Sequence, residues 1–145
     1  MNKLKFNSQI CTTKIQSQRL LDLGLKPETA DMYHTTFYRD NVGYEIIQVR
    51  NEKLPLLSQE LPAWSLHRLK CLLPTKIPYE SGYLTTEIIN NVNLMFITDT
   101  SEQRVISFIH GNLYESMIKC IKWLIKEDYF NKEYLYEETT GKENI

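Results

Sequence analysis

The sequence has few of the residues that form disulfide frameworks or flexible linkers, and no long apolar run. Its 145 residues include three cysteines, five glycines and five prolines. An odd number of widely spaced cysteines argues against a disulfide framework. The longest apolar runs, such as residues 94–97, are far shorter than the roughly 18–20 residues of a membrane span. The N-terminal segment lacks the apolar stretch of a secretory signal. We therefore expect a cytoplasmic protein without membrane contact.

Neither sign of charge prevails in the sequence. The chain contains seventeen basic and eighteen acidic side chains, which gives a net charge of −1. This balance supplies no broad field for a nucleic-acid backbone, and the basic residues are dispersed, which disfavours nucleic acid as a partner. Hydrophobic residues make up 42% of the chain, an ordinary value for a globular protein. We predict a single domain over residues 1–137, stable without a metal or cofactor, and a flexible tail over residues 138–145.

Local patterns predict a short helix over residues 12–25. Thr12 or Thr13 can cap its first turn, and Gly24 can adopt the left-handed conformation that ends a helix. Leu20 and Leu25 would then make the hydrophobic contact of a Schellman motif. A proline-initiated helical turn follows at residues 26–34.

Five β-rich runs follow. Residues 36–49 predict a hairpin around the turn-forming residues 39–43. Its second run is apolar on both faces, which is typical of a strand covered on both sides. Residues 83–89, 93–98 and 103–110 predict three more strands, and their short polar connections favour antiparallel neighbours.

Residues 111–128 predict a long amphipathic helix near the C-terminus. Asn112 can cap it, with Glu115 three residues later as in a capping box. Apolar side chains recur along one face at helical spacing: Tyr114, Met117, Ile118, Ile121, Leu124 and Ile125. The predicted fold is α+β, an antiparallel sheet of about four to five strands packed against helices, this last helix chief among them.

The segment LPAWSLHRLKCLLP, residues 61–74, looks most like a functional motif. The same residues also fit a short helix with well-formed ends, in which Ser65 is the N-cap and Trp64 and Leu69 form a hydrophobic staple. His67 and Cys71 are correctly spaced for two zinc ligands, but a structural site needs four, or three and a water. Because the other histidines and cysteines are scattered singly, we expect a solvated helix face and no metal site.

The other candidate catalytic features are weak. No serine lies in a nucleophile elbow, and Cys120 borders the apolar face of its helix, where a buried and inert thiol is expected. Gly111 and Asn112 precede a helix and could hold an anion there, but Glu115 would compete for the same donors. The sequence therefore predicts no catalytic residue and no enzyme.

Aromatic residues suggest binding. Nine tyrosines and two tryptophans are present, and both residue types are enriched at binding hot spots. Trp123 lies outside the apolar arc of its helix, where it either covers a sheet edge or anchors a partner or second subunit. The candidate interaction surface comprises Trp64, Trp123, Tyr129 and Tyr134.

Two segments carry a resemblance to other proteins: residues 20–32 and residues 62–74. Together they form the pattern LGLxxETADM … PAWSLxxLxxLLP. In this pattern the chain resembles a group of uncharacterised small proteins from phages, prophages and mobile elements of gut anaerobes. The resemblance implies a phage-type origin within a bacterial cell, and it supplies no site residues.

The leading hypothesis is a non-enzymatic phage or prophage accessory protein that binds another protein or a second copy of itself. The alternative is a small-ligand or nucleotide-binding module with a pocket between sheet and helices. Nucleic-acid binding comes third, and last comes an enzyme whose site is assembled from distant residues.

Overall fold

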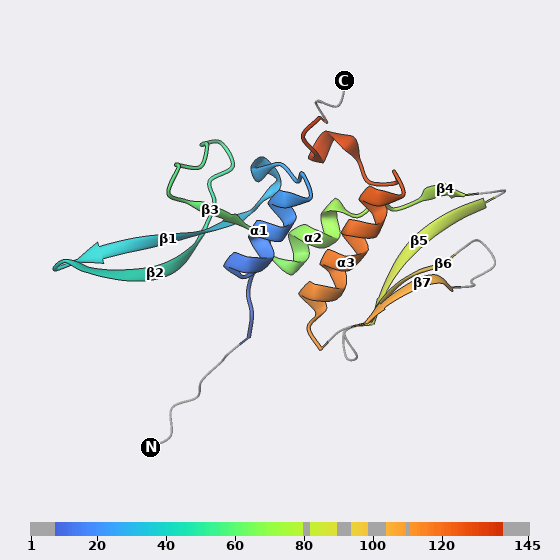
Figure 1. Cartoon of the computed structure of the whole chain (residues 1–145), viewed down its shortest axis with the longest axis horizontal. Coiled ribbons are helices and arrows are strands. Elements are labelled where there is room, and N and C mark those ends of the chain that lie inside the picture. Colours follow the sequence, from blue (N-terminus) through green and yellow to red (C-terminus); the bar gives the residue numbers. More distant parts are fainter. Residues whose placement is uncertain (1–7, 80–81, 90–93, 99–103, 110, 138–145) are drawn as a thin grey trace, which may run out of the picture.

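The computed structural model describes residues 8–79, 82–89, 94–98, 104–109 and 111–137. Figure 1 shows an elongated molecule with a hairpin at one end, a four-stranded sheet at the other and the helices between them. The predicted α+β class is confirmed. In the described part of the chain, no helix is both long enough and apolar enough to span a membrane. The tail predicted over residues 138–145 lies outside the described residues.

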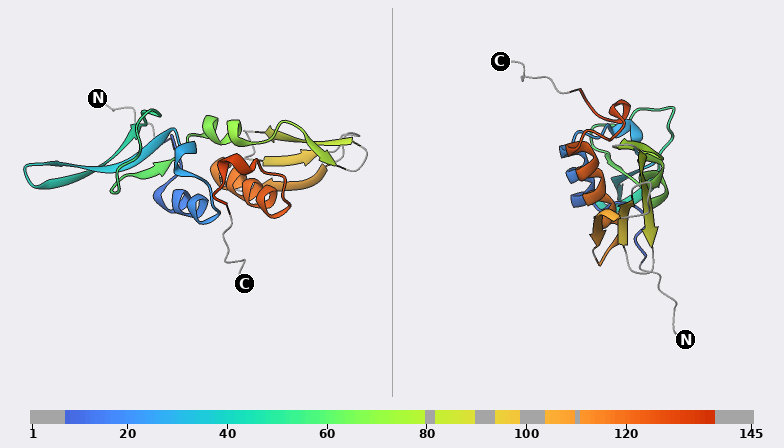
Figure 2. Two further views of the ribbon diagram at one scale, coloured as in Figure 1. Left: turned by 90° about the horizontal axis from the view of Figure 1, so that it is seen from above. Right: turned by 90° about the vertical axis from the view of Figure 1, so that its right-hand side faces the viewer.

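The elements follow one another along the chain in this order: α1 (Lys14–Asp22), the 3-10 helix η1 (Pro27–Thr29), β1 (Met32–Arg39), β2 (Val42–Val49), β3 (Leu61–Ala63), α2 (Leu66–Leu72), β4 (Ile77–Tyr79), β5 (Gly82–Ile89), β6 (Leu94–Thr98), β7 (Arg104–Ile109), α3 (Leu113–Lys126) and the 3-10 helix η3 (Lys132–Tyr134). Figure 2 shows α1 and α3 on the same side of the molecule.

Both ends of α1 form as local patterns predict. Of the two candidate caps, Thr13 is the one used: its Oγ1 accepts from Gln16 N at 3.1 Å, and its own N–H donates to Gln16 Oε1 at 3.0 Å. At the other end Gly24 has φ +99°. Leu25 N donates to Leu20 O at 3.2 Å, and both leucine side chains are fully buried. The predicted Schellman ending is confirmed.

The segment over residues 61–74 forms a strand followed by a capped helix, as predicted. Ser65 Oγ accepts from Arg68 N at 3.1 Å at the start of α2. Trp64 and Leu69, the predicted staple, are both fully buried. The chain leaves the helix in an extended conformation at Leu73, immediately before Pro74, which cannot continue a helix.

The predicted hairpin forms, but the prediction that its second strand is covered on both faces is wrong. β1 and β2 pair in register over their whole length around Asp40 and Asn41, whose φ angles of 52° and 65° define a two-residue type I′ turn. β3 pairs only with residues 32–34 of β1. The outer part of the hairpin therefore has no third strand beside it, and it projects from the body of the molecule (Figure 2).

The strands form two sheets, where the sequence predicted one. One has the order β2-β1-β3 and the other the order β4-β5-β6-β7, and all pairs are antiparallel. β5, β6 and β7 were predicted, whereas the three-residue β4 was not. The sheets are separate because β3 occupies the inner edge of the hairpin and leads into α2 before β4 begins.

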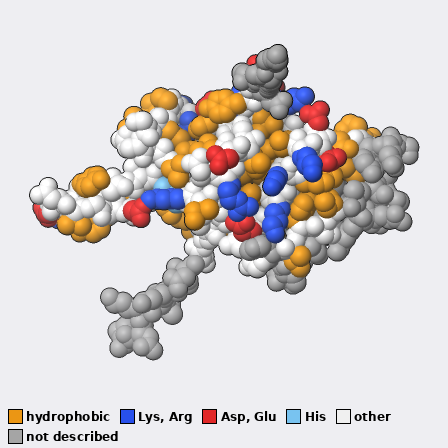
Figure 3. Space-filling model, in the orientation of Figure 1, with side chains coloured by type: hydrophobic (Ala, Val, Ile, Leu, Met, Phe, Trp, Pro, Cys, Tyr) orange, Lys and Arg blue, Asp and Glu red, His pale blue; other side chains and the backbone are white. Residues whose placement is uncertain are grey.

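α3 supplies the largest share of the hydrophobic core. Asn112 caps it, as predicted. Of its predicted apolar face, Met117, Ile118, Ile121 and Leu124 are at most 1% exposed. The opposite face carries exposed lysines, which lie over the helix layer in Figure 3. The core also includes Leu20, Leu25, Trp64, Leu69, Ile77, Leu84 and Phe108.

Candidate functional site

The structure removes Trp64 from the predicted interaction surface. Its side chain is 0% exposed, and its indole Nε1 donates to Thr29 Oγ1 at 2.9 Å. Its backbone N–H donates to Thr12 Oγ1 at 3.0 Å. Because both N–H groups of Trp64 are bonded inside the protein, and its carbonyl accepts from Thr12 N, the residue joins β3 to η1 and to the segment before α1. It cannot contact a partner.

The other three predicted surface residues are half-buried around the end of α3. The Trp123 ring lies 6.4 Å from that of Phe108 on β7 and 5.8 Å from that of Tyr129. Tyr134 packs against Phe130 at 6.0 Å. Trp123 thus covers the outer strand of the four-stranded sheet, which is one of the two roles predicted for it.

A groove lies beside this aromatic cluster. It has a volume of about 480 Å³ and is framed by the ends of α1 and α3 and by the segment that follows α3. An ion pair between Lys132 Nζ and Asp128 Oδ1, at 3.3 Å, stands at its rim. Its apolar lining comes from Leu23, Ile125, Phe130, Leu135 and Tyr136. Its lining includes no strand residue, so it is not the pocket between sheet and helices that the sequence offered as an alternative.

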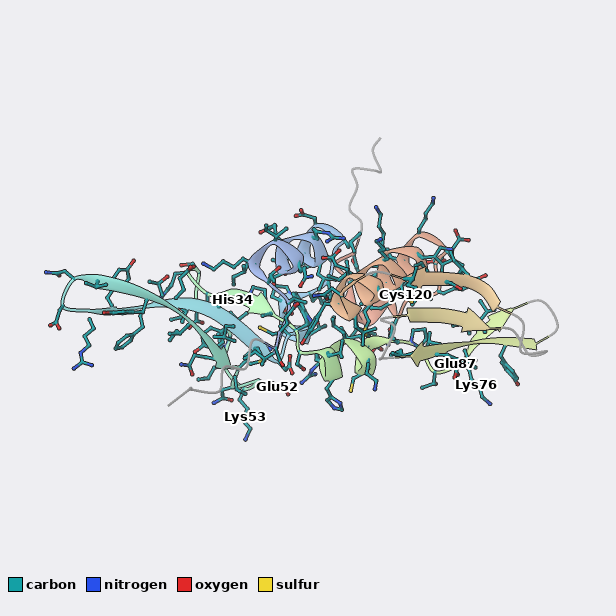
Figure 4. All side chains as sticks on the ribbon, turned by 90° about the horizontal axis from the view of Figure 1, so that it is seen from below. His34, Glu52, Lys53, Lys76, Glu87 and Cys120 are labelled. Carbon is teal, nitrogen blue, oxygen red and sulfur yellow. The ribbon has the colours of Figure 1, made fainter. Side chains whose placement is uncertain are left out.

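The histidines and cysteines do not form a shared site in the described part of the chain. His67 Nε2 and Cys71 Sγ lie 3.6 Å apart on the exposed face of α2. Within the described ranges, no third His, Cys, Asp or Glu joins them in a metal-binding group. His34 Nε2 lies 2.8 Å from the carbonyl oxygen of Thr12, and Figure 4 shows it well separated from Cys120. His110 lies outside the described residues.

Burial makes two of the three thiols unreactive. Desolvation raises the pKa of Cys120 to about 12. Desolvation, with a smaller contribution from the charge of Asp31, raises the pKa of Cys11 to about 11. Cys71 is exposed. The prediction that the Cys120 thiol is buried is confirmed, and a raised pKa disfavours the thiolate, which is the reactive form.

The cap of α3 pairs two of the backbone donors at the start of the helix. Asn112 Oδ1 accepts from Tyr114 N at 2.8 Å and from Glu115 N at 3.3 Å. The carboxylate of Glu115 stands at the same turn and binds Arg19. An anion at this helix start would have to displace the cap and approach a carboxylate.

The most unusual surface is one that the sequence analysis missed. We call the β1–β2 hairpin, residues 32–49, the arm. Large hydrophobic side chains are exposed on both of its faces. On one face are Tyr38, Ile47 and Val49, with exposed fractions of 71%, 39% and 76%; on the other are Phe37, Val42 and Tyr44, with 52%, 49% and 51%.

Few charges accompany these side chains. The arm carries Arg39, Asp40 and Glu45 as its charged residues. Glu45 forms an ion pair with Lys14 at the start of α1. Figure 3 shows hydrophobic side chains spread along the arm with little charge between them. Such a surface matches a protein partner better than a phosphate backbone.

The base of the arm is firmly tied to the body. Arg50 N donates to Asp31 O at 2.9 Å, and Arg50 Nη1 donates to Glu28 O at 2.9 Å. The Asp31 carboxylate accepts from Ser65 N at 2.9 Å and from Ser65 Oγ at 2.5 Å. These bonds fix the arm to η1 and to the cap of α2. The arm is therefore a protrusion held at a defined angle.

In comparisons with protein-family models, curated proteins and solved structures, no match to the chain was found. The geometry of the described residues therefore carries the functional argument.

Proposed function

We propose that this protein acts by binding another protein chain through the arm, as a non-enzymatic accessory factor of phage or prophage type. The phage-type origin rests on the two sequence segments that resemble such proteins. The binding role rests on one observation: six large hydrophobic side chains are exposed across the two faces of an anchored hairpin with few charges.

The arm supports this role because leaving large apolar side chains in contact with water is unfavourable for a protein that binds no partner. Contiguous apolar patches on soluble proteins mark interaction sites or regions prone to aggregation. Phe37 and Tyr44 are directly opposite each other in the β1–β2 register, so their rings can form one aromatic patch. Tyrosine and other aromatic residues dominate binding energy at protein interfaces.

Site-specific photocrosslinking tests the proposal. A photoreactive phenylalanine analogue at position 44 samples the arm, and the same analogue at position 15, on the 76% exposed Ile15 of α1, samples a surface outside it. In bacterial lysate we expect discrete crosslinked products from position 44 and none of comparable yield from position 15. Equal yields at the two positions, or none at position 44, would contradict a binding role for the arm.

Small-ligand binding is the second candidate, favoured by the groove of about 480 Å³ beside Phe130 and Tyr136. Its aromatic lining suits stacking against a planar ring. A thermal-shift panel of nucleotides tests it, because a ligand at 100 times its dissociation constant stabilises the fold by about 2.7 kcal/mol. A rise in Tm that Tyr136→Ala abolishes would support this role. An unchanged Tm across the panel would rule out these ligands.

A further inference from the structure

The described strands leave four sheet edges, and three of them are protected against pairing with another chain. β3 and β4 have three residues each and carry Pro62 and Pro78. The pairing of β7 with β6 is interrupted by a register shift near Thr98. Short strands, prolines and bulges are the usual devices that prevent edge-to-edge association.

The edge of β2 carries none of these devices. It is eight residues long, pairs with β1 without a register shift, and contains neither lysine nor proline. Among the described helices and strands, β1 is the one that it contacts extensively, and Glu45 adds an ion pair to Lys14 of α1. An edge this long and rich in exposed apolar residues is expected to recruit another strand.

The backbone groups on this edge can be assigned. In an antiparallel pair, successive residues point their N–H and C=O alternately toward the partner strand and away from it. Arg50 N donates to Asp31 O, so Arg50 points toward β1. Counting back along β2, the residues that point outward are Gly43, Glu45, Ile47 and Val49.

Pro62 supports this assignment independently. It lies opposite Tyr33, which by the same alternation points its backbone toward β2 and away from β3. Pro62 is therefore at a position where no N–H is needed.

We infer that two copies of this chain associate by antiparallel pairing of their β2 edges about a twofold axis, forming one six-stranded sheet. This inference rests on the arm being the binding surface proposed above. A register centred on Ile46 places Ile46 beside Ile46 of the second copy and Glu45 beside Ile47. The two Glu45 side chains are then diagonal neighbours and not directly opposite each other, and every outward N–H faces an outward C=O.

The exposed side chains of β2 fit a second copy. Val42, Tyr44, Ile47 and Val49 are 39–76% exposed, and edge pairing places them beside β2 of the second copy, whereas Phe37 and Tyr38 on β1 lie one strand away from the seam. A twofold interface brings the same surface of both subunits together, so a surface with a large net charge would repel its own copy. The arm carries one basic and two acidic residues, and its net charge is small.

The molar mass of the full chain in solution tests the inference. Light scattering over a dilution series is expected to show twice the 17.2 kDa of one chain at high concentration. Ile47→Lys and Val49→Lys place a charge on the pairing edge and should each weaken dimerisation by at least about tenfold. Val49 is 76% exposed, so its replacement leaves the isolated fold intact.

Ile109→Lys is the matched control. Ile109 is 64% exposed on β7, an edge strand of the other sheet. This variant should dimerise as the wild type does. A wild type with the mass of one chain at all concentrations would overturn the inference. So would a dimer that survives both β2 variants, or one that Ile109→Lys disrupts.

The crosslinking experiment separates this inference from the proposed function. Crosslinks from position 44 to a different protein, together with a monomeric mass, would refute self-pairing and leave the arm as a binding surface. An absence of crosslinks from position 44 would refute both.

Discussion

Arg19 on α1 holds the carboxylate of Glu115 on the first turn of α3, with Nη1 2.6 Å from Oε1 and 2.8 Å from Oε2. Gln16 Nε2 donates to the same carboxylate at 2.7 Å. The Thr13 capping box positions Gln16, so a local helix start is coupled to a contact between residues 99 positions apart in the chain. This contact keeps α1 and α3 side by side and positions the segment that leads into the arm.

Removing either side of this contact should destabilise the fold modestly. Arg19 is 42% exposed and Glu115 17% exposed, so solvent screens part of the attraction. We expect Arg19→Ala and Glu115→Ala each to lower the free energy of unfolding, with a coupling of about 1 kcal/mol between them. A double-mutant cycle by urea denaturation measures it. A coupling near zero would show that α1 and α3 are held together by apolar packing alone.

Trp64 should behave as a core residue. Trp64→Phe keeps most of the buried ring but leaves Thr29 Oγ1 without its donor, so we expect a loss of about 1–2 kcal/mol. Trp64→Ala should cost about 3–5 kcal/mol by opening a cavity. Both changes should leave the crosslinking yield at position 44 unaltered under conditions where the protein is folded. A stable Trp64→Ala variant that loses binding would place the indole at an interface after all.

Ile121 tests the position of the core. Its side chain is 0% exposed in the centre of α3, so Ile121→Asp buries an unpaired carboxylate. We expect the variant to lose its cooperative thermal transition. Ile15→Asp makes the same change at a site that is 76% exposed and should melt nearly as the wild type does. Circular dichroism melts of the two variants give the comparison. A cooperative melt of Ile121→Asp would contradict this packing.

The thiols should differ sharply in reactivity. Burial raises the pKa of Cys11 to about 11 and that of Cys120 to about 12, so both stay protonated at pH 8, while Cys71 is exposed. Alkylation of the native protein should therefore stop at one label, located on Cys71. Addition of urea should release the other two. Mass spectrometry counts the labels, with Cys71→Ser as the control that should take up none in the native state. Rapid labelling of Cys120 would show an open core.

The elements that the sequence predicts well are those decided by neighbouring residues. The cap at Ser65, the Schellman ending at Gly24 and the apolar face of α3 each depend on residues within a few positions of one another, and all three are confirmed. The turn at Asp40 and Asn41 belongs to the same class, because only a few residue types adopt two consecutive positive φ angles readily.

What the sequence does not reveal depends on long-range pairing. A strand that is apolar on both faces is typical of a buried position, so the β2 pattern around Tyr44 and Ile47 gave the wrong expectation. Its exposure follows from the position of the hairpin beyond the body, where β1 is the described element that β2 packs against extensively, and that position depends on contacts made across the fold. Trp64 was misplaced for a related reason, since its partner Thr29 is 35 residues away. A long hairpin with few charged residues, followed by a proline-containing strand, is the signal that could have indicated the arm.

Amide hydrogen exchange resolved along β2 tests the pairing of the arm most directly. Tyr44 and Ile46 point their N–H groups toward β1 and should exchange slowly at every concentration. At concentrations where the mass is twice that of one chain, the N–H groups of Glu45, Ile47 and Val49 should become as slow as these, and on dilution they should become fast again. If those three exchange rapidly at every concentration while Tyr44 and Ile46 stay protected, β2 is a free edge and the pairing proposed here does not occur.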